Sequence, residues 1–194
     1  KAKGMTMCEI PPIRMLVLTL TGRCNFKCLY CYASEQDPVD MTEETAIAAV
    51  ALAHVSKNQF LLQFSGGEPL LQFPLIRKVV DFVEKNHVNA QMQIQTNGAL
   101  LTKDIGKWLF DHNVGIGISC DGRPELMNRL RVSKDGDRSS QKVIQAFQNL
   151  GEVNIEAGIT CVVTDDTVEQ LDGIADMAYF YGNVHQIGFD ILRE

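Results

Sequence analysis

Short apolar runs alternate with longer amphipathic stretches along the chain. Runs that are mostly apolar and bounded by turn residues are typical of strands buried in a parallel sheet. Between consecutive runs, apolar residues recur at helical spacing, so we expect strand and helix to alternate throughout. The predicted strands are residues 14–21, 60–65, 91–96, 115–120, 156–163 and 185–191.

The amphipathic stretches also carry signals for helix ends. Pro74 and Thr102 favour the first turn and the N-cap of a helix, and Gly151 is expected to cap the end of one. The expected buried faces consist of Ala46, Ile47, Val50 and Ala51, of Ile76, Val79, Val80 and Val83, and of Val143, Ile144 and Phe147.

This alternation predicts an α/β fold. A crossover of helix length returns the chain in the same direction, so the strands form a parallel sheet that is either open or curved into a partial barrel. Ligands of such sheets bind at the carboxyl ends of the strands. The unusual segments all follow predicted strands and should share that rim: residues 24–31, Gly66-Gly67-Glu68-Pro69, Thr96-Asn97-Gly98 and Asp121-Gly122.

Size and composition indicate one domain. The chain has 194 residues, 45% of them hydrophobic, and no apolar run of the roughly 18 residues that a membrane span requires. Its formal charge of -6 disfavours a nucleic-acid partner. We expect no targeting peptide, a cytoplasmic location, a lead-in over residues 1–13 and a core domain over residues 14–194. Because no helix follows the last strand to cover its edge, we expect a fragment of a longer protein.

Three of the six cysteines, Cys24, Cys28 and Cys31, lie in one short segment. Thiolates in such a segment can converge on one iron-sulfur cluster, which normally takes four cysteine ligands. Three ligands would leave one iron open for a bound molecule, as a catalytic zinc site leaves one position open. Two alternatives stay open: a structural zinc site with its fourth ligand elsewhere, and a disulfide that strands the third thiol.

The spacing C-x3-C-x2-C after a first strand resembles the signature of the radical S-adenosylmethionine superfamily, and the resemblance covers nearly the whole chain. It implies an incomplete six-stranded, TIM-like (β/α) barrel with a [4Fe-4S] cluster whose open iron binds the amino and carboxylate groups of S-adenosylmethionine. It also implies that an electron from the reduced cluster breaks the sulfonium bond, which releases methionine and a 5′-deoxyadenosyl radical.

Within that superfamily, residues 24–32 and 66–71 and the Asp121-Gly122 turn are most similar to peptide and protein maturases related to anaerobic sulfatase-maturating enzymes. Those maturases usually carry a C-terminal domain with further clusters, called SPASM. This auxiliary domain is expected to be absent from the chain.

The residues around the cysteines suit the same ligand. Gly66 and Gly67 would let the backbone approach a bound molecule, and Glu68 would place an anion at the rim to accept hydrogen bonds from the ligand's ammonium group. A glycine-rich turn with a solvated glutamate is the alternative. Asn97 and Ser119, at strand ends, have side chains able to hydrogen-bond ribose or carboxylate oxygens.

The resemblance implies two more contacts. Tyr30 is similar in position to an aromatic residue that contacts the adenine, although a packed tyrosine fits the sequence as well. Arg131 matches an arginine of similar maturases that would pair with the ligand carboxylate, and Arg129 is near enough to compete for that role. Cys120 and Cys161 lie in apolar strand patterns and are expected to pack in the core.

These observations predict a radical enzyme with a [4Fe-4S] cluster and S-adenosylmethionine as cofactors. By resemblance, the substrate is a peptide or protein, and the electron comes from an external reductant such as flavodoxin or ferredoxin. The alternatives are a radical enzyme that acts on a small metabolite, a cofactor precursor or a tetrapyrrole, and a non-catalytic iron-sulfur or zinc module. No role is assigned to Cys8 or to the histidines, and no catalytic side chain beyond the cluster ligands.

Overall fold

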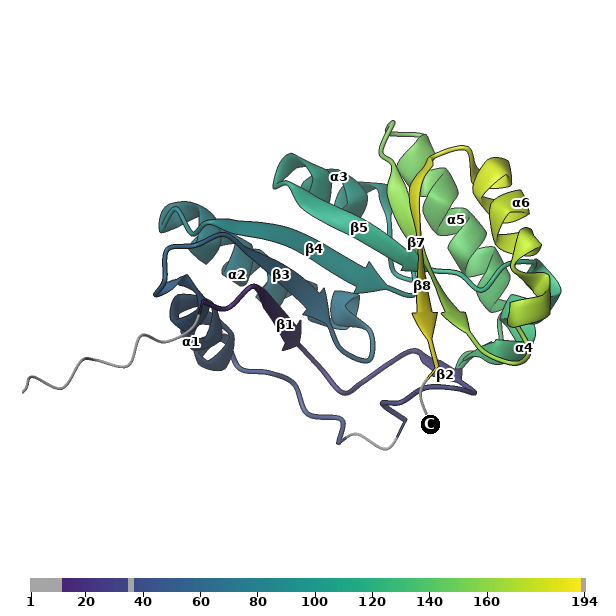
Figure 1. Ribbon diagram of the computed structural model, residues 1–194, viewed down its shortest axis with the longest axis horizontal. Helices are drawn as coiled ribbons and strands as arrows, with labels where there is room; N and C mark the ends of the chain where they lie inside the picture. The colour runs from purple at the N-terminus through teal and green to yellow at the C-terminus, as the bar shows by residue number, and fades with distance from the viewer. Residues whose placement is uncertain (1–11, 35–36, 193–194) are drawn as a thin grey trace, which may run out of the picture.

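A computed structural model describes residues 12–34 and 37–192 of the chain. Within them, parallel strands form one curved sheet, and the predicted six strands are confirmed (Figure 1). β1 and β8 lie at its two edges and do not pair with each other, so the barrel is incomplete. In spatial order the strands are β1 (Met15–Thr19), β3 (Phe60–Ser65), β4 (Ala90–Thr96), β5 (Val114–Ser119), β7 (Ala157–Val163) and β8 (Val184–Ile191).

Helices cover the outer face of this sheet (Figure 1). Both predicted helix starts are confirmed, because Pro74 lies in the first turn of α2 and the Thr102 hydroxyl accepts a hydrogen bond from the backbone N–H of Ile105 at the start of α3. None of the helices in the described ranges has the length and apolarity needed to cross a bilayer. The helices are α1 (Glu43–His54), α2 (Phe73–Lys85), α3 (Lys103–Asp111), α4 (Pro124–Leu130), α5 (Ser139–Gly151) and α6 (Asp172–Tyr181), with 3-10 turns η1 (Pro69–Gln72) and η2 (Val168–Gln170).

Two details of the predicted helices are wrong. Gly151 is the last residue of α5 rather than its cap, and the first left-handed residue after this helix is Asn154, with φ of 56°. On α1, Ala51 is exposed, and the buried positions are Ala46, Val50 and Ala53. Spacings of four and three residues keep these positions on one side of the helix, whereas Ala51 is turned toward solvent.

A second, two-stranded sheet was not predicted. β2 (Phe26–Cys28) and β6 (Arg131–Ser133) pair antiparallel, with Cys28 opposite Arg131. Each strand is too short to show a periodic pattern, so the sequence carries no local signal for it. The pairing matters because it fixes the middle of the cysteine segment beside an arginine that is distant in sequence.

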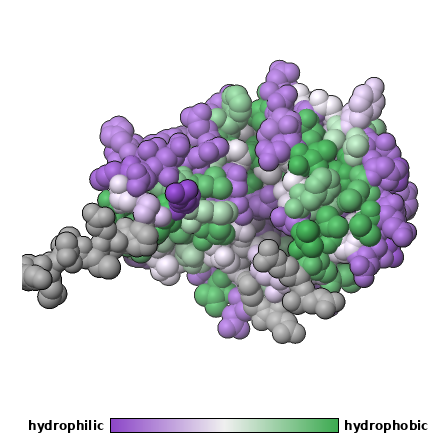
Figure 2. All heavy atoms as spheres, viewed as in Figure 1, coloured by the Kyte–Doolittle hydropathy of each residue, from purple (hydrophilic) through white to green (hydrophobic). Residues whose placement is uncertain are grey.

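Side chains on the main strands alternate between the helix layer and the interior of the curved sheet. On β3, Phe60, Leu62 and Phe64 are buried under the helices, whereas Gln63 and Ser65 point to the inner face. The inner face is therefore polar, unlike the apolar interior expected for a strand buried on both sides. On β8 the outward positions remain exposed, and apolar side chains appear at the surface around this strand and α6 (Figure 2).

The packing of α5 against α6 gives a test of the fold. Phe147 is 1% exposed, and its ring stacks on that of Tyr181 with a centroid distance of 4.1 Å. We predict that Phe147→Ala lowers the free energy of unfolding by about 3–5 kcal/mol, because removing the buried ring leaves a cavity between the helices. Chemical denaturation would measure this change.

The matched control is Phe110→Ala, since the Phe110 side chain is 60% exposed on α3. It should change the unfolding free energy by less than about 0.5 kcal/mol. Equal losses for the two variants would contradict the assignment of Phe147 to the core.

Candidate functional site

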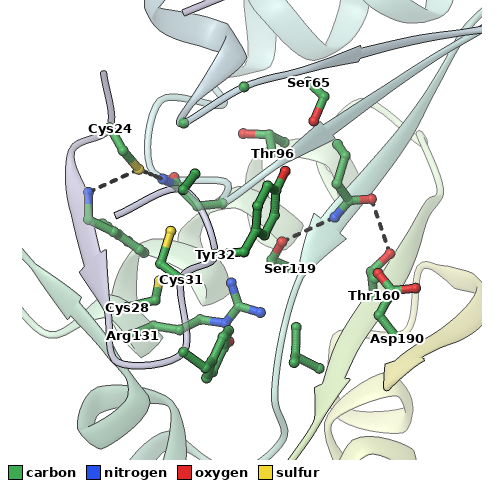
Figure 3. A pocket seen from close by; sticks show the side chains of 18 of the residues that line it. Cys24, Cys28, Cys31, Tyr32, Ser65, Thr96, Ser119, Arg131, Thr160 and Asp190 are labelled. Atoms are coloured by element: carbon green, nitrogen blue, oxygen red, sulfur yellow. Dashed lines mark hydrogen bonds between the residues drawn. The ribbon is translucent and has the colours of Figure 1, made fainter. Parts of the chain in front are cut away.

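A cavity of about 460 Å³ opens at the carboxyl ends of the strands (Figure 3). The structure brings almost every predicted site residue to it, from the cysteine segment, from the ends of β3, β4 and β5, and from β6. Glu68 is the exception and does not line it. The predicted residues in the wall are Cys24, Cys28, Tyr30, Cys31, Gly66, Gly67, Asn97, Ser119 and Arg131.

The cysteine segment is held in place by the glycines that follow β3. The Gly67 N–H donates to the Thr21 carbonyl at 2.8 Å, and the Glu68 N–H donates to the Arg23 carbonyl at 2.9 Å. A Cβ on Gly67 would lie 2.3 Å from the Arg23 carbonyl oxygen, so only glycine permits this approach. Gly66, at φ of 145°, has the same constraint, since its Cβ would lie 2.6 Å from the Thr21 carbonyl oxygen. The glycines therefore let the backbone approach the chain's own cysteine segment.

The base of the segment is also tied to the chain that returns toward α1. The Thr21 hydroxyl donates to Asp40 at 2.6 Å, and the Arg23 guanidinium makes a two-point contact with the same carboxylate. Residues on both sides of the segment are thus anchored before any ligand binds.

The three thiols have surroundings suited to a buried metal-binding sulfur. Cys24 Sγ accepts hydrogen bonds from the Phe26 N–H at 3.3 Å and the Asn97 Nδ2 at 3.7 Å, which would stabilise a thiolate. Burial raises the pKa of the Cys24 thiol, and it raises the pKa of Cys28 to about 11 against the opposing effect of the Arg131 guanidinium. Because burial raises the pKa of both Cys24 and Cys28, a metal bound by these two thiols would have to displace their protons.

Asn97 connects the cysteine segment to the end of β4. Its Nδ2 donates to Asn25 Oδ1 at 2.7 Å as well as to Cys24, and its Oδ1 accepts from the Ala99 N–H at 2.9 Å. The amide predicted to bind a ligand's ribose or carboxylate is therefore already engaged by the chain on both ends. These contacts indicate that Asn97 helps to hold the cysteine segment in place.

Glu68 lies beneath the rim rather than on it. The side chain has no exposed surface, and its carboxylate accepts hydrogen bonds from the Leu70 N–H at 3.0 Å, the Thr96 hydroxyl at 2.7 Å and the Asn97 N–H at 2.8 Å. Burial raises the pKa of the Glu68 carboxyl, and these three donors oppose that rise. The described donors to the carboxylate all belong to the chain itself, and the contact with a ligand's ammonium group stays a prediction.

A second buried carboxylate, Asp121, organises the opposite wall. It accepts from Arg131 Nε at 2.8 Å and Nη2 at 2.9 Å, from the Val162 N–H at 3.2 Å, and from the Tyr30 hydroxyl. The Arg131 Nη1 has no partner among the described residues and is the guanidinium nitrogen left for a ligand. Arg129 instead pairs with Asp166 at the surface, which separates the two arginines that the sequence left in competition.

Sequence reasoning missed several residues of the site. Asp121 was noted only as part of a turn, and Gln95 and Thr160 carry no motif, although both line the cavity. Tyr32, directly after Cys31, stands in the cavity between the cysteines and Ser119 (Figure 3). An aromatic residue beside the third cysteine was the one local signal for it.

Two of the remaining cysteines, Cys120 and Cys161, fall outside the site. Cys120 and Cys161 have no exposed surface and belong to the hydrophobic core, as their strand patterns indicated. Cys8 lies outside the described residues. Within the described ranges, no three histidine, cysteine or acidic side chains are grouped to hold a single metal ion. The donor chemistry, three thiols of one segment around a shared cavity, fits a cluster with three protein ligands.

Comparison with known proteins places this site in context. A sequence profile of the radical SAM superfamily matches residues 18–178. The chain is 37% identical over 183 residues to an uncharacterized protein of Methanocaldococcus jannaschii, covering 93% of this chain and 63% of that protein. It is 28% identical over 177 residues to a cysteine-type anaerobic sulfatase-maturating enzyme of Clostridium perfringens, covering 85% and 48%. It is 27% identical over 166 residues to the Fe-coproporphyrin III synthase of Methanosarcina barkeri, covering 84% and 40%.

A solved structure extends the comparison to the fold. Native anSMEcpe with bound AdoMet and Kp18Cys peptide superposes with a TM-score of 0.84 at 25% sequence identity, over 95% of this chain and 52% of that one. The chain therefore spans about half the length of that protein, and between 40% and 63% of the three relatives by sequence.

The buried role of Glu68 gives a prediction. Glu68→Ala would leave the donors of Leu70, Thr96 and Asn97 without their acceptor, and we expect it to lower the free energy of unfolding by about 2–4 kcal/mol. Denaturant titration would measure the loss. Glu169→Ala is the matched control, because Glu169 is an exposed glutamate on η2 and its removal should be nearly neutral. A neutral Glu68→Ala would show that the carboxylate does not support the rim.

Proposed function

The chain belongs to the radical SAM superfamily, and from that premise we propose that it cleaves S-adenosylmethionine reductively at a [4Fe-4S] cluster held by Cys24, Cys28 and Cys31. One observation carries the proposal: three thiols of one segment face a single cavity, and the other cysteines of the described residues are buried in the core. A cluster bound there would have one iron without a protein ligand.

When bound, the reduced cluster would pass one electron to S-adenosylmethionine, break its sulfur–C5′ bond, and so supply methionine and a 5′-deoxyadenosyl radical that takes a hydrogen atom from a substrate C–H bond. The chain's own groups hold and orient the cofactor. Arg131 Nη1 and the Ser119 hydroxyl are donors suited to its carboxylate, while Tyr30 and Tyr32 offer aromatic surface for the adenine. Gly66 and Gly67 form the adjacent wall without side chains.

A peptide or protein is the substrate that we propose. The support comes from relatives, since one is a sulfatase-maturating enzyme and the anSMEcpe structure contains a bound peptide. The polar inner face, with Gln95, Thr160 and Asp190 in the cavity wall, offers hydrogen-bonding groups for such a substrate. The electron would come from an external protein such as flavodoxin or ferredoxin, in the cytoplasm. Residues 14–194 would form the radical SAM core of the protein, with residues 1–13 as a lead-in.

A second candidate substrate is a tetrapyrrole or another small metabolite. It is favoured by the similarity to an Fe-coproporphyrin III synthase, which covers 84% of this chain. Incubating the reduced full-length protein with S-adenosylmethionine and either coproporphyrin or a cysteine-containing peptide would separate the two, because only a true substrate is consumed together with the cofactor.

Cleavage itself can be tested without a substrate. The full-length protein, reconstituted without oxygen and reduced with dithionite, should convert S-adenosylmethionine to 5′-deoxyadenosine, detected by chromatography. We predict that Cys28→Ala loses both this product and the cluster absorbance, because removal of one of three ligands leaves the cluster unsupported.

The matched control is Cys161→Ala, which removes a thiol from the core and should retain the cluster. A full cluster spectrum in Cys28→Ala, or an iron coordinated by four side chains in the wild type, would overturn the proposed function.

A further inference from the structure

The side chain of Gln95, on β4, lies on the inner face of the sheet and hydrogen-bonds to side chains on two other strands, β5 and β7. Its Nε2 donates to the Ser119 hydroxyl at the end of β5, with a distance of 3.1 Å. Its Oε1 accepts from the Thr160 hydroxyl on β7, also at 3.1 Å. Ser119 and Thr160 are themselves paired in the strand register, so one amide spans from β4 to β7 across β5.

Glycine at position 117 makes this span possible. Gly117 is the register partner of Gln95 on β5, and a Cβ there would lie 2.5 Å from Gln95 Oε1. Any other residue would push the amide off the sheet. The Gln95 amide therefore occupies the space that the missing side chain of Gly117 leaves free.

The direction of the hydrogen bonds has a chemical consequence. An amide nitrogen donates and does not accept, so the Ser119 oxygen receives a hydrogen from Gln95 while its own hydroxyl hydrogen is not used in that bond. No other partner of Ser119 Oγ exists among the described residues. Because Ser119 lines the cavity, its hydroxyl hydrogen is available to donate to a group bound there. Arg131, whose Nη1 has no partner among the described residues, lines the same cavity.

We propose that Gln95 is a positioning residue that turns the Ser119 hydroxyl hydrogen toward the carboxylate of bound S-adenosylmethionine. This inference rests on the proposed function. A ligand carboxylate only accepts hydrogen bonds, so a serine held as a donor suits it, and a serine that donates to its neighbour does not. Thr160 takes the other end of the amide, because its hydroxyl donates to Gln95 Oε1 while the amide nitrogen donates to Ser119.

Gln95→Glu tests the direction with almost no change of shape. A carboxylate accepts from both Thr160 and Ser119, so the serine hydrogen is withdrawn from the cavity. We expect the anaerobically reconstituted full-length variant to bind S-adenosylmethionine about tenfold more weakly by isothermal titration calorimetry, with an unchanged cluster spectrum, since one hydrogen bond to a charged group is lost.

The matched control is Gln93→Glu, on the same strand and the same inner face. Gln93 donates to Gln63 at 2.6 Å and does not line the cavity, so its replacement adds the same charge without touching Ser119. Its affinity for S-adenosylmethionine should remain at the wild-type value. An equal loss in the two variants would mean that added charge is responsible and would overturn the proposal.

A Ser119→Ala background provides the decisive comparison. If Gln95 acts through Ser119, Gln95→Glu causes no further loss of affinity once the hydroxyl is gone, whereas a full further loss would overturn the proposal. Gly117→Ala displaces the amide by a different route and should weaken binding in the wild-type background but not with Ser119→Ala. If the wild-type protein binds no S-adenosylmethionine, the proposed function fails with the inference; if it binds and Gln95→Glu has no effect, only the inference fails.

Discussion

The buried ion pair between the carboxylate of Asp121 and the guanidinium of Arg131 is the interaction on which the site depends. Removing a charge from water is costly, and the Asp121 charge is compensated by hydrogen bonds from Arg131, the Tyr30 hydroxyl and the Val162 N–H. Those donors come from the cysteine segment, from β6 and from β7. The carboxylate therefore links the cysteine segment to β6 and β7, and the same pairing leaves Arg131 Nη1 without a partner among the described residues.

On the other side of the cavity, the buried carboxylate of Glu68 likewise holds two segments together through hydrogen bonds. It joins the turn after β3 to the end of β4, and the adjacent Gly67 lets that turn contact the cysteine segment directly. With a carboxylate fixing each wall, the cysteine segment has little freedom left. Such preorganisation lowers the entropic cost of ordering the segment when a cluster and a cofactor bind.

The two faces of the sheet carry different side chains, which explains how the fold tolerates a polar interior. The outward positions of the strands are apolar and pack under the helices, where Phe64, Ile94 and Ile118 have almost no exposed surface. The inward positions are free to carry glutamine, serine and threonine, because they line an open cavity and satisfy one another. Stability comes from one face and the chemistry from the other.

Local patterns in the sequence were sufficient for the six strands of the main sheet, for most helix faces, for the Thr102 cap and for the cysteine motif, because periodicity and spacing are properties of neighbouring residues. The rule that ligands meet the carboxyl ends of parallel strands also located the rim correctly. Only the tertiary structure revealed that Glu68 faces inward, that Arg129 pairs away from the cavity while the expected Arg131 lines it, and that Gln95 spans to Thr160. Each of these depends on which distant segments are paired and in what register, and a hydrogen bond between strands far apart in the chain leaves no periodic trace in either one.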